Sequence, residues 1–219
     1  MPSRLEKKLS RLKAHVVNLG DKVERIVEDS LRAVLDRNAA LARDVINSDR
    51  EIDLFEIEIE EDCLACLALD QPVAMDLRFI VAVLKINSDL ERIADLAVKI
   101  AEQAEPLATR SDRRAAPFDV RHESKLAMEM ITRAVDARVA IDADMARSVL
   151  DLDDEVDRIH AGSYEAIRLA IMEDPERTGE LLRYLSVSRC LERIADHATN
   201  IAEDIIYTVR GDIERHARD

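Results

Sequence analysis

The chain has 219 residues, of which 47% are apolar, 36% are charged and 3% are aromatic, with only four Gly and five Pro, a composition that predicts an all-α protein with a core. The formal net charge of −14 repels phosphate backbones, which argues against nucleic-acid binding and favours cations or basic protein surfaces. Because the start of the chain has no apolar signal core, and no run approaches the roughly 18 apolar residues of a membrane span, we expect a soluble, cytoplasmic protein.

The first half of the chain is divided into three predicted helices. They cover about residues 4–37, 39–69 and 74–104, with Gln71-Pro72 as the break before the third. Residues 103–122 carry two Pro and mixed charge, which predicts a linker between two domains.

The second half follows the same plan. Helices are predicted over about residues 119–141, 143–173 and 176–210, with Asp174-Pro175 as the break before the last. Each half therefore has three long apolar stripes, which are enough to form a small bundle.

Two blocks of sequence recur between the halves. DLERIADLAVKIAE at 89–102 matches CLERIADHATNIAE at 190–203 at ten of fourteen positions, and LARDVINSDREID at 41–53 aligns with MARSVLDLDDEVD at 145–157. The offsets are 101 and 104 residues, so a loop differs in length between the copies. We predict two tandem, pseudo-symmetric three-helix bundles with six long helices, over residues 1–108 and 115–219.

Acidic stripes lie beside the apolar stripes of the repeated helices. Glu91, Asp95 and Glu102 have i, i+4, i+11 spacing, and the second copy repeats them as Glu192, Asp196 and Glu203. Like charges at i, i+4 repel each other and weaken an isolated helix. Because the same repulsion recurs at equivalent positions of both halves, it indicates that a bound cation offsets it.

The preceding helix of each half supplies a second acidic stripe. It consists of Asp49, Asp53, Glu56 and Glu60 in the first half, and of Asp153, Asp157, His160 and Tyr164 in the second. If these faces pack together, four carboxylates converge in each half. Carboxylates favour Mg²⁺, manganese or iron, and His160 shifts the preference toward a transition metal such as Zn²⁺ or iron.

Simpler interpretations remain open for the charged and sulfur-containing residues. Acidic i, i+4 pairs are commonly a solvated helix face, and Arg92 and Arg193 would neutralise them as surface pairs. Cys63-x-x-Cys66 would be half of a zinc site, but no second pair completes it, and both fit as small core residues. His15, His122 and His216 have no partner pattern, so we expect them on the surface.

The run LERIADHATNIAE, the segment QPVAMDLR at 71–78 and the duplicated plan resemble the PhoU family of bacterial phosphate-uptake regulators. The resemblance covers essentially the whole chain. It implies two three-helix bundles whose [E/D]-x-x-x-D motifs bind multinuclear metal clusters, often of iron. It also implies a cytoplasmic protein that works with the phosphate ABC transporter and a sensor kinase to repress the phosphate-starvation response.

Carried over by position, the family's metal motifs fall on eight residues: Asp49, Asp53, Glu91, Asp95, Asp153, Asp157, Glu192 and Asp196. Weaker candidates are Glu56, Glu60, Glu102, His160, Asn200 and Glu203. Two departures from the family are apparent. Ala94 and Ala195 replace Gly, which preserves close packing, and Lys99 stands where the second half has Asn200, so the two sites need not be equally occupied.

The leading functional prediction is a non-enzymatic regulator, expected as a homodimer, that docks on the transporter's ATPase subunit and on the kinase. No Gly-rich phosphate loop and no nucleophile–base pattern supports an enzyme. The alternative is a di-metal oxidase or metal-storage bundle, which needs Glu-x-x-His on two helices; Asp157-x-x-His160 approximates this motif, but its counterpart is Asp53-x-x-Glu56. A third possibility is a metal-free helical scaffold.

Overall fold

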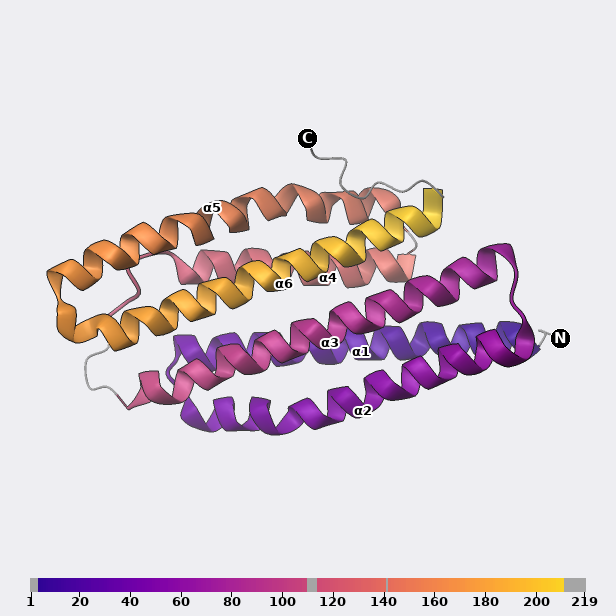
Figure 1. Ribbon diagram of the computed structural model, residues 1–219, viewed down its shortest axis with the longest axis horizontal. Coiled ribbons are helices and arrows are strands. Elements are labelled where there is room, and N and C mark those ends of the chain that lie inside the picture. Colours follow the sequence, from indigo (N-terminus) through magenta and orange to yellow (C-terminus); the bar gives the residue numbers. More distant parts are fainter. Residues whose placement is uncertain (1–3, 110–113, 141, 211–219) are drawn as a thin grey trace.

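The computed structural model describes residues 4–109, 114–140 and 142–210, and the elements in these ranges are all helices (Figure 1). They are α1 (Arg4–Leu35), α2 (Ala39–Asp70), α3 (Ala74–Ala108), α4 (Val120–Ala140), α5 (Ala143–Glu173), the short 3₁₀ helix η1 (Pro175–Arg177) and α6 (Thr178–Arg210). The all-α prediction with six long helices is confirmed within the described ranges. None of these helices contains a stretch long and apolar enough to cross a membrane.

The third helix is longer than the sequence predicts. It continues through Pro106 to Ala108, so the segment between α3 and α4 begins at residue 109 rather than 103. Pro106 lies in the last turn of α3, where its missing N–H leaves one helical hydrogen bond unmade. Burial of Leu107 fixes this turn, and Arg37 Nη1 donates to the Leu107 carbonyl (3.2 Å).

Two other predicted boundaries shift slightly. α1 ends at Leu35, two residues early, because Arg37 adopts a left-handed conformation (φ 53°) that a helix cannot continue. Before α6, Pro175 opens the single turn of η1, so the helix proper begins at Thr178 rather than at residue 176.

The α1–α3 and α4–α6 bundles pack against each other along α3 and α6, which lie side by side in the centre of Figure 1, with α2 and α5 outermost. The buried apolar side chains form one continuous cluster drawn from all six long helices. Ile93 on α3 and its counterpart Ile194 on α6 are both fully buried. The two bundles thus share a core.

Polar contacts along the α3–α6 seam show that the two helices run antiparallel. Lys85 Nζ donates to Asp204 Oδ1 (3.0 Å), His197 Nδ1 lies 2.8 Å from Asp89 Oδ1, and Arg183 Nη1 donates to Gln103 Oε1 (3.2 Å). His197, to which the sequence assigned no role, therefore joins the two halves.

A buried ion pair also ties the halves together near the α1–α2 turn. Arg37 Nη2 lies 2.8 Å from Glu180 Oε1 of α6, and both side chains are almost inaccessible. The same nitrogen donates to the Arg114 carbonyl (3.1 Å) and to the Tyr184 hydroxyl (3.3 Å). Arg37 thus connects the first bundle, the inter-bundle segment and α6.

Candidate metal centres

The acidic stripes of α2 and α3 lie close enough to act on one another, which is the condition on which the metal prediction rests. Burial, followed by the charges of Asp53 and Asp95, raises the pKa of Asp49 above its usual value. Burial likewise raises the pKa of Glu91, with contributions from Asp95 on its own helix and from Glu56 and Asp53 on α2. Carboxylates of each helix act on those of the other, so these five residues form one acidic face, called here the first face.

Cationic side chains partly neutralise the first face. Arg92 Nε lies 3.4 Å from Glu91 Oε2, and its Nη1 lies 3.4 Å from Asp95 Oδ2. The charge of Lys99 acts to lower the pKa of Asp49. Asp49 Oδ1 is nevertheless buried and accepts no hydrogen bond from any described residue. This oxygen offers a lone pair to a cation.

A buried amide orients Glu56 at one end of the first face. Asn87 Nδ2, on α3, donates to Glu56 Oε1 (2.9 Å) and to the Glu56 carbonyl (3.0 Å). Burial, then the charges of Glu60 and Asp53, raises the pKa of Glu56, so Glu60 also belongs to this neighbourhood. Asn87 was not predicted, although an amide in the apolar run of α3 is a signal for such a role.

The second face, between α5 and α6, combines Asp153, Asp157, Glu192 and Asp196. Burial, then Asp157, raises the pKa of Glu192, and Asp153 adds to the shift. Burial, then Glu192 and Asp157, raises the pKa of Asp196, against the opposing charges of His197 and Arg193. The four predicted carboxylates of the second half are therefore brought together.

His160 lies beside the second face and begins a chain of hydrogen bonds that leads into the core. Its Nδ1 is 2.9 Å from Ser188 Oγ, which donates to Glu123 Oε1 (2.6 Å). Because the Ser188 proton points to Glu123, the hydroxyl accepts from Nδ1–H, and Nε2 then carries the lone pair that a metal would use. Burial lowers the pKa of His160, which favours this neutral form.

Glu123 is the charged residue at the inner end of this chain. It is fully buried, and burial raises the pKa of its carboxyl group to about 7 against the opposing hydrogen bond from Ser188, with the charge of Glu192 adding to the shift. It belongs to neither repeated block and to no acidic stripe of the sequence. Its only sequence signal is that Leu19 occupies the equivalent position in the first half, at the offset of 104 residues.

Two of the weaker candidates lie toward the seam between the bundles. Asn200 Nδ2 donates to Asp89 Oδ1 across the seam, over 3.5 Å. The charge of Glu102 acts on the thiol of Cys190 on α6. Glu203 is half-buried on α6. Asn200 and Glu102 are therefore engaged between the bundles rather than within either acidic face.

A different cluster has the most compact set of ligand atoms among the described residues. Atoms of His15, Glu58 and Asp62 lie within 4.8 Å of one another, a spacing that no three of the predicted ligands reach within the described ranges. Arg11 enters this cluster, with Nη2 3.0 Å from Glu58 Oε1 and Nε 3.3 Å from Asp62 Oδ2. The cluster is thus an ion-pair network between α1 and α2. His15 is half-buried against Phe55, contrary to the expected surface position.

His122, Cys63 and Cys66 follow the simpler interpretation. His122 is half-exposed and pairs with Glu155 (2.8 Å), while His216 lies outside the described residues. Cys63 and Cys66 are buried, and burial raises the pKa of the Cys63 thiol to about 12. Both cysteines therefore pack as small core residues, as the simpler interpretation predicts.

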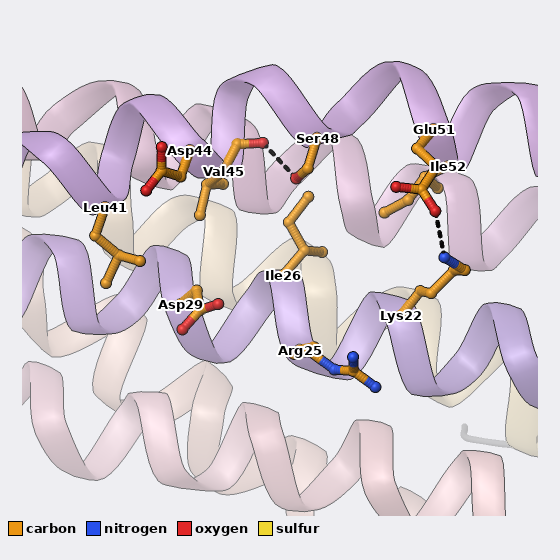
Figure 2. Close-up of a pocket in the computed structure, with 10 residues that line it drawn as sticks. All are labelled: Lys22, Arg25, Ile26, Asp29, Leu41, Asp44, Val45, Ser48, Glu51 and Ile52. Carbon is orange, nitrogen blue, oxygen red and sulfur yellow. Dashed lines mark hydrogen bonds and ion pairs between the residues drawn. The ribbon is translucent and has the colours of Figure 1, made fainter.

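A groove of about 280 Å³ lies on the other side of α2, toward α1. Figure 2 shows Lys22 reaching across it to Glu51, with 2.5 Å between Nζ and Oε1, and Ser48 donating to its own helix. Arg25, Asp29 and Asp44 also line it, so the charges are mixed. None of the predicted ligands lines this groove, which is therefore separate from both acidic faces.

Comparison with known sequences identifies the family. The sequence model of the PhoU domain matches residues 16–104 and again residues 120–205, which together cover most of the chain. The chain belongs to the PhoU family. The two matched PhoU domains correspond to the α1–α3 and α4–α6 bundles, so the resemblance noted in the sequence is confirmed.

Relatives within the PhoU family span nearly the whole chain. The phosphate-specific transport system accessory protein PhoU homolog of Pseudomonas aeruginosa is 38% identical, over 95% of this chain and 86% of that protein. The accessory protein PhoU of Serratia marcescens is 33% identical, over 95% and 85%.

Solved PhoU structures share the fold. The crystal structure of PhoU from Pseudomonas aeruginosa superposes with a TM-score of 0.92 and 37% identity, over 95% of this chain and 100% of that one. The phosphate transport system regulatory protein PhoU from Streptococcus pneumoniae gives a TM-score of 0.87 and 28% identity, over 96% and 99%. These likenesses confirm the duplicated three-helix architecture.

Proposed function

We propose that this chain is a non-enzymatic, cytoplasmic regulator of phosphate uptake. In this proposal it represses the phosphate-starvation response by contact with the ATPase subunit of the phosphate ABC transporter and with a sensor kinase. The observation that carries the proposal is the match along 95% of the chain to relatives named as accessory proteins of the phosphate-specific transport system.

We also propose that the two acidic faces bind metal ions. Carboxylate oxygens are donors for hard cations such as Mg²⁺ and for manganese and iron, with Zn²⁺ a further candidate at His160. The buried Asp49 Oδ1 and the raised pKa values of Glu91, Glu192 and Asp196 support the fit, because a bound cation would relieve the mutual repulsion. The metal would supply positive charge and link α2 to α3, and α5 to α6.

The regulatory function is tested by deletion of the gene and capture of the partners. Deletion is expected to switch phosphate-scavenging genes on in ample phosphate, and the intact gene should restore repression. Purified protein is expected to capture the ATPase subunit or the kinase at low salt, and capture should weaken as salt rises, since the chain is acidic. Normal repression in the deletion strain, together with no capture at low salt, would overturn the proposal. Light scattering tests the predicted homodimer.

The metal proposal is tested by elemental analysis and thermal unfolding. Added metal should raise the melting temperature of the wild type, because an ion that binds the folded state stabilises it. The double variant Glu192→Gln/Asp196→Asn should lose the part of this increase that comes from the second face. Glu165→Gln/Glu173→Gln, two exposed changes on α5, is the matched control. A full increase in the face variant would place the metal elsewhere.

A further inference from the structure

The α2–α3 pair exposes four large apolar side chains in the part nearest its turn. Ile57 and Leu64 on α2 are 47% and 52% exposed, and Leu77 and Val81 on α3 are 42% and 39% exposed. Spacings of seven and four residues place each pair on one side of its helix. In the part of the chain that the structure describes, α2 packs only against α1 and α3, which leaves it outermost in Figure 1 and its outer surface without a covering helix.

The register of the two helices brings these side chains to the same level. Asn87 Nδ2 on α3 donates to Glu56 Oε1 on α2, which aligns these antiparallel helices. Eight residues closer to the turn on each helix, the alignment sets Leu64 at a level between those of Leu77 and Val81. Exposed apolar side chains are ordinary when they are scattered, but a contiguous group indicates an interaction surface.

The exposed group continues the first face toward the turn. On α2, Ile57 follows Asp53 by four residues, which places both on the same side of that helix. On α3, Leu77 precedes Asp95 by 18 residues, or five full turns, so the two also share a side. Ile57, Leu64, Leu77 and Val81 are called here the apolar patch.

The apolar patch has an acidic edge on α2 and a basic edge on α3. Glu61 and Arg78 are exposed, and neither forms an ion pair with a described residue. Glu58, three residues before Glu61, pairs with α1, so Glu61 lies on the edge farther from α3. Lys85, seven residues after Arg78, pairs with α6, so Arg78 lies on the edge toward α6. The patch therefore lies between two opposite charges.

The second bundle does not repeat this pattern, although it has the same fold. At the offsets of 104 and 101 residues, the equivalents of Ile57, Glu61, Leu64, Leu77, Arg78 and Val81 are Ala161, Glu165, Arg168, Thr178, Gly179 and Leu182. Three of the four apolar side chains and the basic edge are thus absent, and Glu165 pairs with Arg168 on its own helix. Since the shared fold forms without the pattern, folding alone does not account for it.

An apolar patch between an acidic and a basic edge is complementary to a second copy of itself. A two-fold axis parallel to the helices turns the α2 edge of one copy toward the α3 edge of the other. Leu64 would then pack between Leu77 and Val81 of the second copy, with Glu61 beside Arg78 of that copy. A two-fold axis across the helices would instead set α2 on α2 and bring like charges together, which is unfavourable.

We propose that the apolar patch joins two copies of this chain, first bundle to first bundle, about an axis parallel to α2 and α3. A second copy is the occupant that satisfies both edges. An anionic membrane would repel Glu61 and the adjoining first face, and a basic helix of another protein would repel Arg78. The inference names the interface of the homodimer expected above and does not depend on the regulatory part of the proposed function.

The test is sedimentation equilibrium of the full chain, with chelator present so that metal on the acidic faces cannot join two copies. The wild type should dimerise reversibly. Leu64→Asp and Val81→Asp should each raise the Kd of the dimer at least tenfold, because each places a charge in an apolar contact. Met172→Asp changes an exposed apolar residue near the α5–α6 turn. It is the control and should dimerise as the wild type does.

Charge reversal tests the orientation of the two copies. Glu61→Arg and Arg78→Glu should each weaken the dimer, and the double variant should recover most of the wild-type affinity, because its edges again carry opposite charges. Both positions are on the surface, so these variants decide the question if the Asp variants do not fold, which circular dichroism would show. A double variant as weak as the single ones would overturn the parallel axis.

The remaining outcomes separate this interface from the proposed function. A wild-type dimer that Leu64→Asp and Val81→Asp leave intact would overturn the interface but keep the homodimer. A monomeric wild type would overturn both and leave the repression test unaffected. If that monomer captures the ATPase subunit or the kinase, and Leu64→Asp abolishes capture, the patch binds that protein rather than a second copy.

Discussion

At the scale of single residues, the informative positions are buried ones where the two halves carry different side chains. Glu123 occupies the position of Leu19, and Ser188 occupies the position of Asn87. The second half thereby acquires a buried carboxyl group joined to His160 through one hydroxyl. Duplication thus preserved the backbone plan while the polar interior of the two bundles diverged.

Glu123 makes a testable contribution to pH-dependent stability. The folded chain holds this proton with a pKa of about 7, against a usual value of 4.5, so the contribution is fully present below pH 4.5 and is lost as pH rises through 7. The difference corresponds to a loss on the order of 3 kcal/mol. Urea unfolding at pH 5 and pH 8 should show a smaller decrease in the Glu123→Gln variant than in the wild type.

Exposed Glu165→Gln is the control for the Glu123 prediction, and it should follow the wild-type pH dependence. If the free energies of unfolding of Glu123→Gln and of the wild type decrease equally between pH 5 and pH 8, then Glu123 is ionised in the folded chain and the prediction is wrong.

Sequence periodicity located the acidic faces but not the buried polar residues. The eight principal carboxylates recur at i, i+4 spacing in both halves, so a helical projection alone groups them. Glu123 and Arg138 belong to no repeated pattern, and a helical projection predicts that charged residues such as these are exposed to solvent. Their burial depends on how α4 packs against α6 and α1, and a single sequence does not contain that information.

At the scale of elements, the caps of α2 and α5 are duplicated along with the helices. Asn38 Oδ1 accepts from the backbone N–H groups of Ala40 and Leu41, each at 3.1 Å. Asp142 Oδ1, at the offset of 104 residues, accepts in the same way from Asp144 (2.9 Å) and Met145 (3.1 Å). Each cap satisfies N–H groups that the first turn of a helix leaves unpaired.

Removal of either cap should destabilise the protein by a similar amount. Asn38→Ala and Asp142→Ala are each expected to lower the free energy of unfolding by about 1 kcal/mol, whereas Asp142→Asn should change it little. Urea denaturation measures these differences. Exposed Asp44→Ala is the reference for a change without capping, and an equal effect of Asn38→Ala and Asp44→Ala would contradict the assignment.

Helix number and order were predictable because breakers and caps are local signals. The end of α3 was not, since a proline usually marks a boundary and here it does not. Tertiary contacts override the local preference at this point: Leu107 is buried and its carbonyl accepts from Arg37, which is 70 residues away in the sequence.

At the scale of the whole molecule, α1 and α4 approach closely between the halves. A Cβ added to Gly20 would lie 2.9 Å from Val135 Cγ1 and 3.1 Å from Cγ2. Such a spacing is too short for two carbon atoms, and the β-branched side chain of Val135 has few alternative rotamers. Gly20 therefore permits the two bundles to pack at their present distance.

A double-mutant cycle tests this contact. Gly20→Ala should lower the free energy of unfolding by about 1–3 kcal/mol through overpacking, although alanine is the better helix former. In the Val135→Ala background the same change should become neutral or stabilising, which gives a coupling energy above about 0.5 kcal/mol. An identical effect of Gly20→Ala in both backgrounds would show that the halves do not meet closely there.

The antiparallel seam between α3 and α6 also determines which halves can pair with each other. The repeat offset of 101 makes Cys190 the counterpart of Asp89 and Leu96 the counterpart of His197. Two copies of the first half, joined in the same way, would set Asp89 against Leu96, and two copies of the second would set His197 against Cys190. Only the unlike halves bring Asp89 to His197, at 2.8 Å. Self-association of either half would leave a half-buried polar group without its partner, so the seam itself selects the pairing of unlike halves.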